Sequence, residues 1–327
     1  MRAHLTKGIR MTSETGKRLH AIGWVGMAGI IVLLAALTGC GTVDAVKKQT
    51  RKVVKAMPFT GSRFKNKVAI LPFQNRTYLL QRDVDELFYN RLTRNLESTC
   101  SDVIWVRPSD PAYPSQLKDV PRLVNGQVDN LELSRRGQEL GFQAVLTGGV
   151  LTVEAAEKES GILLFKDSAY YECVRVNFQI FHTGTGAKLL DETLTCETEI
   201  DGASFDAIEK KDTRGTYELE DAMGQIVTGG SDRVCEAIMK EKWQGFVVSV
   251  EDGRVILSSG RESGLKVGDA LTVYERGEII EGASGERFIL SGVKSAEIEV
   301  SEVLVGRATA RIKGEGRVVA GFTVRAD

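Results

Sequence analysis

Histidine is almost missing from this chain, and most chemistry that depends on imidazole is excluded with it. The 327 residues contain three histidines, of which His4 and His20 lie within the first twenty residues. A Ser-His-Asp triad or a histidine-based metal site further along would have to depend on His182 alone. His182 adjoins a Thr-Gly-Thr-Gly sequence at residues 183–186 that is typical of a turn, so we expect a solvated turn residue there. We therefore expect no catalytic residue, no metal site and no cofactor, and hence no enzyme.

An excess of positive charge is also missing. The chain has 43 Lys and Arg against 44 Asp and Glu, a formal net charge of −1. The first 39 residues hold five Lys or Arg and one Glu, so the rest of the chain is near −5. A mildly acidic protein is a poor binder of phosphate backbones, which excludes nucleic acid as the main partner. The glycines at 148–149 and 184–186 fall inside or between expected strands and not at a helix start, so no nucleotide or other small-molecule substrate is expected.

The cysteines show no C-x-x-C spacing, which gives no indication of a zinc knuckle or a thioredoxin-type motif. Besides Cys40, the chain has Cys100, Cys173, Cys196 and Cys235, an even number that suggests disulfides in an oxidising compartment. A symmetric hairpin would place Cys173 opposite Cys196, with Cys100–Cys235 as the companion bond. The apolar pattern of the two strands instead requires a one-residue bulge, which would put Cys173 and Cys196 on opposite faces. Both arrangements stay open here, as do free buried thiols.

The N-terminal segment has the pattern of a secretory signal. Five basic residues precede an uncharged apolar run at 21–37, which is a little short for a bilayer span of ~20 residues. The run ends in Leu37-Thr38-Gly39-Cys40, which resembles a bacterial lipobox. That resemblance implies cleavage before Cys40 and attachment of fatty-acyl chains such as palmitate to its thiol, each buried CH₂ contributing roughly 0.8 kcal/mol of membrane affinity. The alternative is an uncleaved membrane anchor with an incidental cysteine.

The residue after the cysteine bears on location. Gly41 stands where an aspartate would signal retention in the inner membrane, so the resemblance points to the periplasmic face of a Gram-negative outer membrane.

We predict four parts of the chain. These are a lipoprotein signal peptide at 1–39, a lipid-anchored tether at 40–62, an α/β domain at 63–243 and a small β-barrel domain at 244–327.

The central part predicts alternating strands and helices. Strands are expected at 67–71, where Pro72 ends the apolar run, and at 103–106, 143–153, 170–181 and 188–200. Helices are expected from Asp83 as N-cap to Glu97, from Asn130 to a C-terminal Gly141, and from Tyr217 to Lys240, where Gly229-Gly230 is expected to kink or break the helix. This order predicts a mixed sheet with packed helices.

Three stretches of this part resemble one family. The sequences KVAILPFQNRT, LGFQAVLTGGV and VNFQIFHTGTGAKLLDETLT are similar to the curli-secretion (CsgG-like) lipoprotein domain over residues 66–240. The resemblance implies an anticodon-binding/TolB-N-like α/β fold and a homo-oligomeric ring. Secretion pores of that family insert two amphipathic hairpins, of which each strand needs ~9–11 residues. The candidate segments 154–168 and 201–216 lack barrel-type alternation. We therefore expect no pore, with the apolar part of 154–168 forming a loop that faces a membrane or a partner.

The C-terminal part predicts a small all-β barrel. Asp252-Gly253 is a strong hairpin signal, and the inward residues are expected to include Val255, Leu257, Leu271 and Val273. The stretch from 253 to 312 resembles the C-terminal domain of the flagellar assembly T protein, with the family positions held by Gly260, Gly264, Leu265, Gly268, Asp269, Val273, Tyr274, Gly285 and Glu286. We expect Asp269 to be a turn carboxylate that bonds its own backbone.

These features favour a non-enzymatic outer-membrane lipoprotein that supports a periplasmic assembly, either a flagellar basal body or a secretion system, through contacts with periplasmic or outer-membrane proteins. The alternatives are a subunit of an outer-membrane secretion channel and a lipoprotein regulator of a peptidoglycan synthase.

Overall fold

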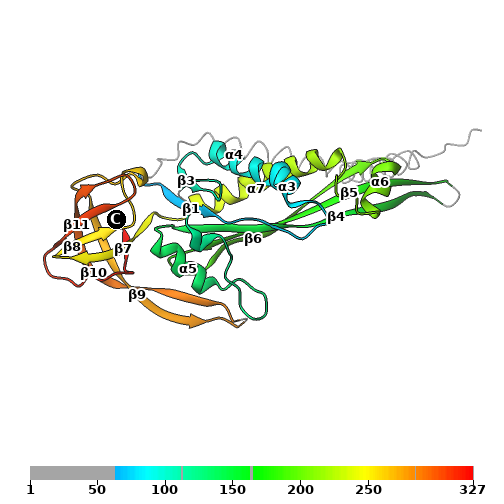
Figure 1. Ribbon diagram of the computed structural model, residues 1–327. Helices are drawn as coiled ribbons and strands as arrows, with labels where there is room; N and C mark the ends of the chain where they lie inside the picture. The colour runs from blue at the N-terminus through cyan, green and yellow to red at the C-terminus, as the bar shows by residue number, and fades with distance from the viewer. Residues whose placement is uncertain (1–62, 112, 163–164, 284, 327) are drawn as a thin grey trace, which may run out of the picture. The chain divides into compact units, whose positions relative to one another are not determined.

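The computed structural model describes residues 63–326 except 112, 163–164 and 284. The lipobox-like sequence, Cys40 and the tether up to residue 62 lie outside the described residues. The described chain forms a mixed sheet with packed helices, followed by a closed six-stranded antiparallel barrel (Figure 1). The fold class expected from the sequence is confirmed.

The sheet has the strand order β3–β1–β4–β5–β6, with a short strand β2 paired to β4. β1 is parallel to β3 and β4, whereas β4, β5 and β6 are antiparallel neighbours. Residues 68–71 are all fully buried because both faces of β1 are covered, which accounts for their uninterrupted apolar run. The strands are β1 Asn66–Ile70, β2 Gln74–Asn75, β3 Val103–Val106, β4 Ala144–Ile162, β5 Phe165–His182 and β6 Lys188–Ile200.

One face of the sheet is covered by helices α3 Gln81–Val84, α4 Asn90–Thr99 and α7 Glu218–Met239, with a π-helical turn η1 Asp85–Tyr89 joining α3 to α4 (Figure 1). The expectation that Asp83 caps this helical segment is wrong. The carbonyl of Leu80 already accepts the N–H groups of Asp83 and Val84 at 3.0 and 3.2 Å. Because Leu80 is the extended residue before the first turn, the helix begins at Gln81 and Asp83 lies inside it.

Helix α7 is continuous over 22 residues, so the predicted break at Gly229-Gly230 is wrong. The reason for Gly230 is packing. A Cβ atom at this position would lie 2.4 Å from Cζ of Phe178 on β5, which is too close for two non-bonded carbon atoms. Glycine therefore lets α7 approach the sheet closely, and the backbone stays helical.

The other face of the sheet is covered in part by helix α5 Asn130–Glu139 and a 3₁₀ turn η2 Ser115–Leu117. Asp129 caps α5 by accepting the N–H of Glu132 at 3.0 Å. Gly141 follows the helix with φ of +78°, in the left-handed conformation expected for a helix-ending glycine. This layer buries Leu133, Val145 and Phe181, together with Ala69, Leu71, Leu117 and Phe142.

The β4–β5 hairpin is much longer than the sequence indicates. β4 has 19 residues and β5 has 18, and the pairing continues from Glu154 opposite Cys173 to Ile162 opposite Phe165. The loop was expected in the apolar part of segment 154–168, residues 161–165. For Gly161, Ile162 and Phe165 the expectation is wrong, since they are paired in β4 and β5, and 163–164 lie outside the described residues. The second candidate segment, 201–216, forms helix α6 Gly202–Glu209, which Asp201 caps by accepting the N–H of Ser204 at 2.7 Å.

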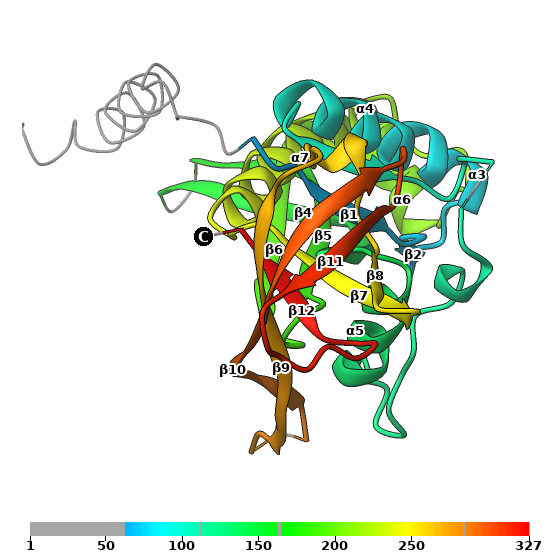
Figure 2. The same ribbon diagram turned by 90° about the vertical axis from the view of Figure 1, so that its left-hand side faces the viewer.

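The barrel has the closed strand order β10–β11–β8–β7–β12–β9 (Figure 2). Asp252 and Gly253 have φ of +48° and +74°, as a type I′ hairpin requires. The inward residues expected from the sequence are all buried. The elements are β7 Gln244–Glu251, β8 Arg254–Leu257, the 3₁₀ turn η3 Arg261–Ser263, β9 Ala270–Glu281, β10 Arg287–Val303, β11 Ala308–Lys313 and β12 Thr323–Arg325.

The β9–β10 hairpin extends past the other barrel strands and lies alongside α5 (Figures 1 and 2). Arg287 forms an ion pair with Asp129, in which Nη2 donates to both carboxylate oxygens at 2.9 and 2.8 Å. Asn130 accepts the N–H of Arg287 at 3.1 Å and donates to its carbonyl at 2.6 Å. The N–H of Ile289 also donates to the carbonyl of Thr185 at 2.9 Å. These contacts fix the hairpin against the N-terminus of α5 and the turn between β5 and β6.

Candidate functional site

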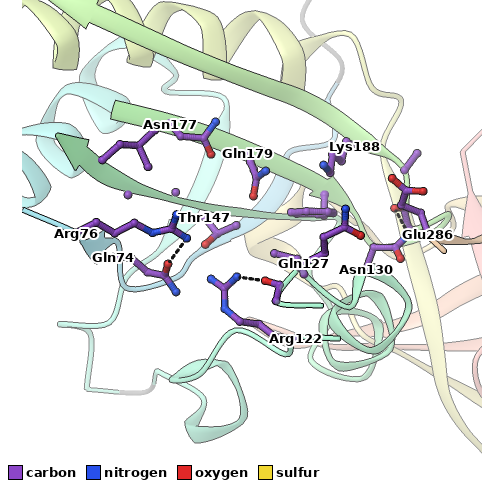
Figure 3. A pocket seen from close by; sticks show the side chains of 18 of the residues that line it. Gln74, Arg76, Arg122, Gln127, Asn130, Thr147, Asn177, Gln179, Lys188 and Glu286 are labelled. Carbon is purple, nitrogen blue, oxygen red and sulfur yellow. Dashed lines mark hydrogen bonds between the residues drawn. The ribbon is translucent and has the colours of Figure 1, made fainter. Parts of the chain in front are cut away.

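A groove of about 570 Å³ lies on the sheet face that α5 leaves uncovered. Its floor is formed by β4 and β5, and its walls by β2, the segment before α5 and the tip of the β9–β10 hairpin. Figure 3 shows polar side chains from all of these elements converging on the groove. Those that matter below are Arg76, Arg122, Thr147, Asn177, Gln179 and Glu286.

The floor is polar because the sheet continues past the cover that α5 provides. Val145 and Phe181 are paired and lie beneath α5, whereas the next pair on the same face is Thr147 and Gln179. Two residues further, Asn177 is paired with Gly149. Since side chains on one face alternate with a period of two, this face changes from apolar to polar at Thr147.

One end of the groove carries positive charge. Arg76 follows β2 and donates to the side-chain oxygen of Gln74 at 3.2 Å. Arg122 donates to the carbonyl of Gly126 at 2.7 Å. Within the described part of the chain, neither guanidinium forms an ion pair with a carboxylate, and Figure 3 shows both beside the groove. This end therefore holds two charges that the described residues leave uncompensated.

Lys188, which also lines the groove, is neutralised by a carboxylate of the sheet. Asp191 on β6 accepts hydrogen bonds from Lys188 at 2.7 Å, from Gln179 at 3.1 Å and from Asn177 at 3.2 Å. Burial alone would raise the pKa of Asp191, but these three donors hold that pKa below its usual value. Asp191 thus stays ionised and pairs with Lys188. The charges that the described residues leave unpaired in the groove are those of Arg76 and Arg122 and, at the hairpin tip, that of Glu286.

His182 is buried, so the expectation of a solvated turn residue is wrong. It is 8% exposed, and Gln244 at the start of the barrel lies against it. The amide nitrogen of Gln244 donates to Nε2 of His182 at 2.8 Å, so Nδ1 carries the proton and donates to Oγ1 of Thr185 at 2.9 Å. Burial, with Arg325 adding to the effect, lowers the pKa of His182 to about 4. Nε2 thus connects the sheet to the start of the barrel, and Nδ1 holds the turn that follows β5.

Asp269 has the role expected from the sequence. The N–H of Lys266 donates to its carboxylate at 2.8 Å, which closes the turn before β9. The same carboxylate also forms an ion pair with Arg63 at 2.6 Å. No local pattern predicted this second contact, which connects the barrel to the start of the described chain.

The structure brings two of the four candidate cysteines together. Cys100 after α4 and Cys235 in α7 form a disulfide, whereas Cys173 and Cys196 are free. The β5–β6 register is shifted between Ile180 and Phe181, so Cys196 pairs with Val174 and not with Cys173. The Cys173–Cys196 bond that a symmetric hairpin would allow is therefore not formed. The two thiols lie on opposite faces, as the bulged alternative requires.

Glu172 is a buried carboxyl that the sequence analysis missed. It is fully buried on β5, where Thr216 donates to one of its oxygens at 2.8 Å. Loss of water raises the pKa of Glu172. A signal existed in the sequence, because residue 172 has the same parity as the inward-facing Val174, Val176 and Phe178.

Two further classes of site can be checked over the described residues. In that part of the chain, no group of three or more His, Cys, Asp or Glu side chains is placed to hold a metal ion. The helices described here also include none with both the length and the apolar character needed to cross a bilayer.

No protein-family model matches the chain, and no curated protein matches it. Solved structures give distant matches. A PelC dodecamer from Paraburkholderia phytofirmans is 16% identical, covers 53% of this chain and 91% of its own, and has a TM-score of 0.29. Lipoprotein GNA1162 from Neisseria meningitidis is 12% identical over 52% of this chain and 99% of its own, with a TM-score of 0.28. TolB from Acinetobacter baumannii is 11% identical over 78% of this chain and 62% of its own, with a TM-score of 0.29. No function follows from values of this size.

Proposed function

We propose that this chain is a non-enzymatic lipoprotein of the CsgG-like class. Lipid on Cys40 anchors it to the periplasmic face of the outer membrane. Two folded domains, 63–243 and 244–327, then support a periplasmic assembly, either a flagellar basal body or a secretion system, through protein–protein contacts. The observation that carries the anchor is the Leu37-Thr38-Gly39-Cys40 sequence directly after an uncharged apolar run.

Changing the cysteine tests the anchor. In Cys40→Ser the thiol that would receive lipid is missing, so we expect an uncleaved precursor that leaves the outer-membrane fraction. Cys173→Ser is a matched control, since this free thiol lies in the folded sheet. Membrane fractionation and mass spectrometry of the mature N-terminus give the readout. A Cys40→Ser protein that fractionates with the outer membrane at the wild-type level would contradict the anchor.

Exposed apolar side chains on the β9–β10 hairpin support a role in protein contacts. Ile279, Ile280 and Leu290 are 45%, 44% and 45% exposed, and Val293 is 69% exposed. Ile279 and Ile280 are consecutive and point to opposite faces of the hairpin. Ile280 and Leu290 share a face because Ile280 pairs with Phe288. Single exposed apolar residues are common, but exposed apolar side chains on both faces of one projecting hairpin suit a protein partner. We propose that a second copy of the chain binds here, as a step toward a homo-oligomeric ring.

Native mass spectrometry of the detergent-purified protein tests this self-association. We expect Leu290→Asp with Val293→Asp to reduce the oligomer to monomer. Val124→Asp is the control, because Val124 is fully exposed on a different segment. If the wild-type protein is monomeric at micromolar concentration, or if the hairpin variant assembles as the wild type does, the second copy is not the occupant of this surface.

A secretion-channel subunit is the second candidate, and the length of the β4–β5 hairpin favours it. The part of β4 from 154 to 162 has nine residues, the length of a strand that spans a bilayer. Its sequence opposes this role, since Glu154 and Lys158 lie on one face and Glu157 and Glu159 on the other. A ring with a membrane-inserted crown, seen by negative-stain imaging in detergent, would favour the channel.

A further inference from the structure

The groove presents an unsatisfied set of polar groups as well as unpaired charge. Thr147 on its floor is only 4% exposed, and its hydroxyl has no hydrogen-bond partner among the described residues. Because Thr147 lines the groove, a ligand that lies on the floor can form a hydrogen bond with this hydroxyl in place of water.

The two amides beside Thr147 are oriented by Asp191. Asn177 and Gln179 both direct their NH₂ groups to the Asp191 carboxylate, at 3.2 and 3.1 Å. Their carbonyl oxygens are left as acceptors at the groove, because no described residue donates to either oxygen. Acceptors above an extended strand floor suit the N–H groups of a peptide backbone.

The charge distribution selects the sign of the ligand. Arg76 and Arg122 are both without a carboxylate partner among the described residues, whereas Lys188 is neutralised by Asp191. Glu286 also lines the groove without an ion pair among the described residues, but it lies at the end away from the two arginines (Figure 3). Guanidinium groups bind carboxylates with two parallel hydrogen bonds, which makes them strong and directional anchors. A carboxylate of the ligand would therefore lie at the end of the groove where both arginines are found.

Size and aromatic content separate a peptide from a sugar. A volume of about 570 Å³ is within the ~300–1,000 Å³ of typical ligand sites. Saccharide rings usually stack on exposed Tyr or Trp faces, and neither residue type lines this groove. Of its two phenylalanines, Phe181 is buried beneath α5 and Phe288 is half-buried at the hairpin tip.

We propose that this groove binds an extended acidic peptide segment of a partner protein, with one carboxylate held by Arg76 and Arg122 and the peptide backbone held by Thr147, Asn177 and Gln179. This binding role deepens the scaffolding function and rests on its claim of protein partners, but it does not depend on the lipid anchor. It assigns a chemical class to the partner, namely an Asp- or Glu-containing strand.

Fluorescence polarisation of the full-length protein in detergent tests this binding. The probes are two pools of fluorescein-labelled, C-terminally amidated hexapeptides that are identical except for one position pair. One pool carries Asp or Glu there, and the other carries Asn or Gln. The variants are Arg76→Gln, Arg122→Gln and their double variant, together with Thr147→Val, which replaces the hydroxyl by a methyl group. The control is Arg94→Gln, an exposed arginine on α4 at the other face of the sheet.

We expect the acidic pool to bind and the amide pool to have an affinity at least about tenfold lower. This factor corresponds to the loss of a hydrogen bond to a charged group. Each arginine variant should lose about tenfold in affinity, the double variant should not bind measurably, and Arg94→Gln should match the wild type. Binding to the acidic pool should also weaken with added salt. Circular dichroism confirms that each variant is folded.

Three results would overturn the acidic-peptide assignment. These are equal binding of the two pools, no binding of either pool, and binding that the arginine double variant retains. A uronic-acid oligosaccharide is included as a third probe, and selective binding of it would assign the groove to a saccharide. Because membrane fractionation of Cys40→Ser is scored separately, failure of peptide binding is distinguishable from failure of the lipoprotein function.

Discussion

Gly229 and Gly230 are neighbours in α7, yet a methyl group added at each would meet different surroundings. At Gly230 the new Cβ would lie 2.4, 2.8 and 2.9 Å from three ring atoms of Phe178. At Gly229 it would meet only Cδ1 of Leu194 at 3.6 Å, an ordinary contact. Both positions are inside the same helix, so the two alanine substitutions share one propensity change and differ in packing.

The expected magnitudes follow from these two environments. Replacing Gly by Ala inside a helix stabilises it by roughly 1 kcal/mol, so Gly229→Ala should raise the free energy of unfolding by up to about 1 kcal/mol. At Gly230 this gain is opposed by overpacking. Phe178 is 1% exposed, and its ring lies 5.8 Å from that of Phe73 and 5.9 Å from that of Phe88, so it has little room to move. Overpacking of a close-packed core costs about 1–3 kcal/mol, and after the helix gain of about 1 kcal/mol we expect Gly230→Ala to lower the free energy of unfolding by up to about 2 kcal/mol.

Urea unfolding followed by the helical circular dichroism signal measures both variants. This signal reports on the α/β part, because the helices α3 to α7 all belong to it. We expect the two midpoints to shift in opposite directions at unchanged slope. If Gly230→Ala is as stable as Gly229→Ala, then Gly230 has no packing role, and close packing of α7 on the sheet does not explain this glycine.

Three further predictions concern titration and the disulfide. Burial holds the pKa of His182 at about 4 in the folded protein against 6.5 in the unfolded chain. The contribution of the neutral imidazole to the free energy of unfolding is therefore complete above about pH 6.5. It is lost as the pH falls to about 4, by about 3 kcal/mol in total. The decline in unfolding free energy over this pH range should be smaller in His182→Gln, and an equal decline would contradict the buried neutral imidazole. The pKa of Glu172 is raised by burial, so its contribution is present below the unfolded value near 4.5 and is lost as the pH rises through the folded value. Glu172→Gln should therefore stabilise the protein at neutral pH and lose this advantage in acid, as thermal melts at two pH values would show. The Cys100–Cys235 bond closes a loop with a sequence separation of 135 residues, so its loss in the double serine variant should lower the unfolding free energy by about 3–5 kcal/mol, and a reducing agent should then change the wild type only.

Local patterns predicted the elements whose environment is set within a few residues. The period of two in the barrel strands placed Val255, Leu257, Leu271 and Val273 inside, and the positive φ needed at a two-residue hairpin selected Asp252-Gly253. The helix before Gly141 was predicted for the same reason, since glycine there has the left-handed backbone that ends a helix.

The errors arose where a distant segment decides the environment. His182 is buried because Gln244, 62 residues later, lies against it, and no pattern around 182 contains that contact. The long β4–β5 hairpin was missed because its outer part has charged residues on both faces, so it has no apolar alternation to recognise. The groove is assembled from β2, β4, β5, the segment before α5 and the hairpin tip, and its residues share no motif.

The position of Arg287 gives the barrel an influence over the groove. Arg287 binds Asp129, while its neighbours Glu286 and Phe288 form part of the groove wall. A ligand that contacts both this wall and the end with Arg76 and Arg122 would bind best when the hairpin is packed against α5. Thermodynamic linkage is reciprocal. A partner that binds the barrel and stabilises the contact between the hairpin and α5 would therefore also increase the affinity of the groove for its ligand. The contacts of Arg287 would in this way couple a binding event on the barrel to one in the groove.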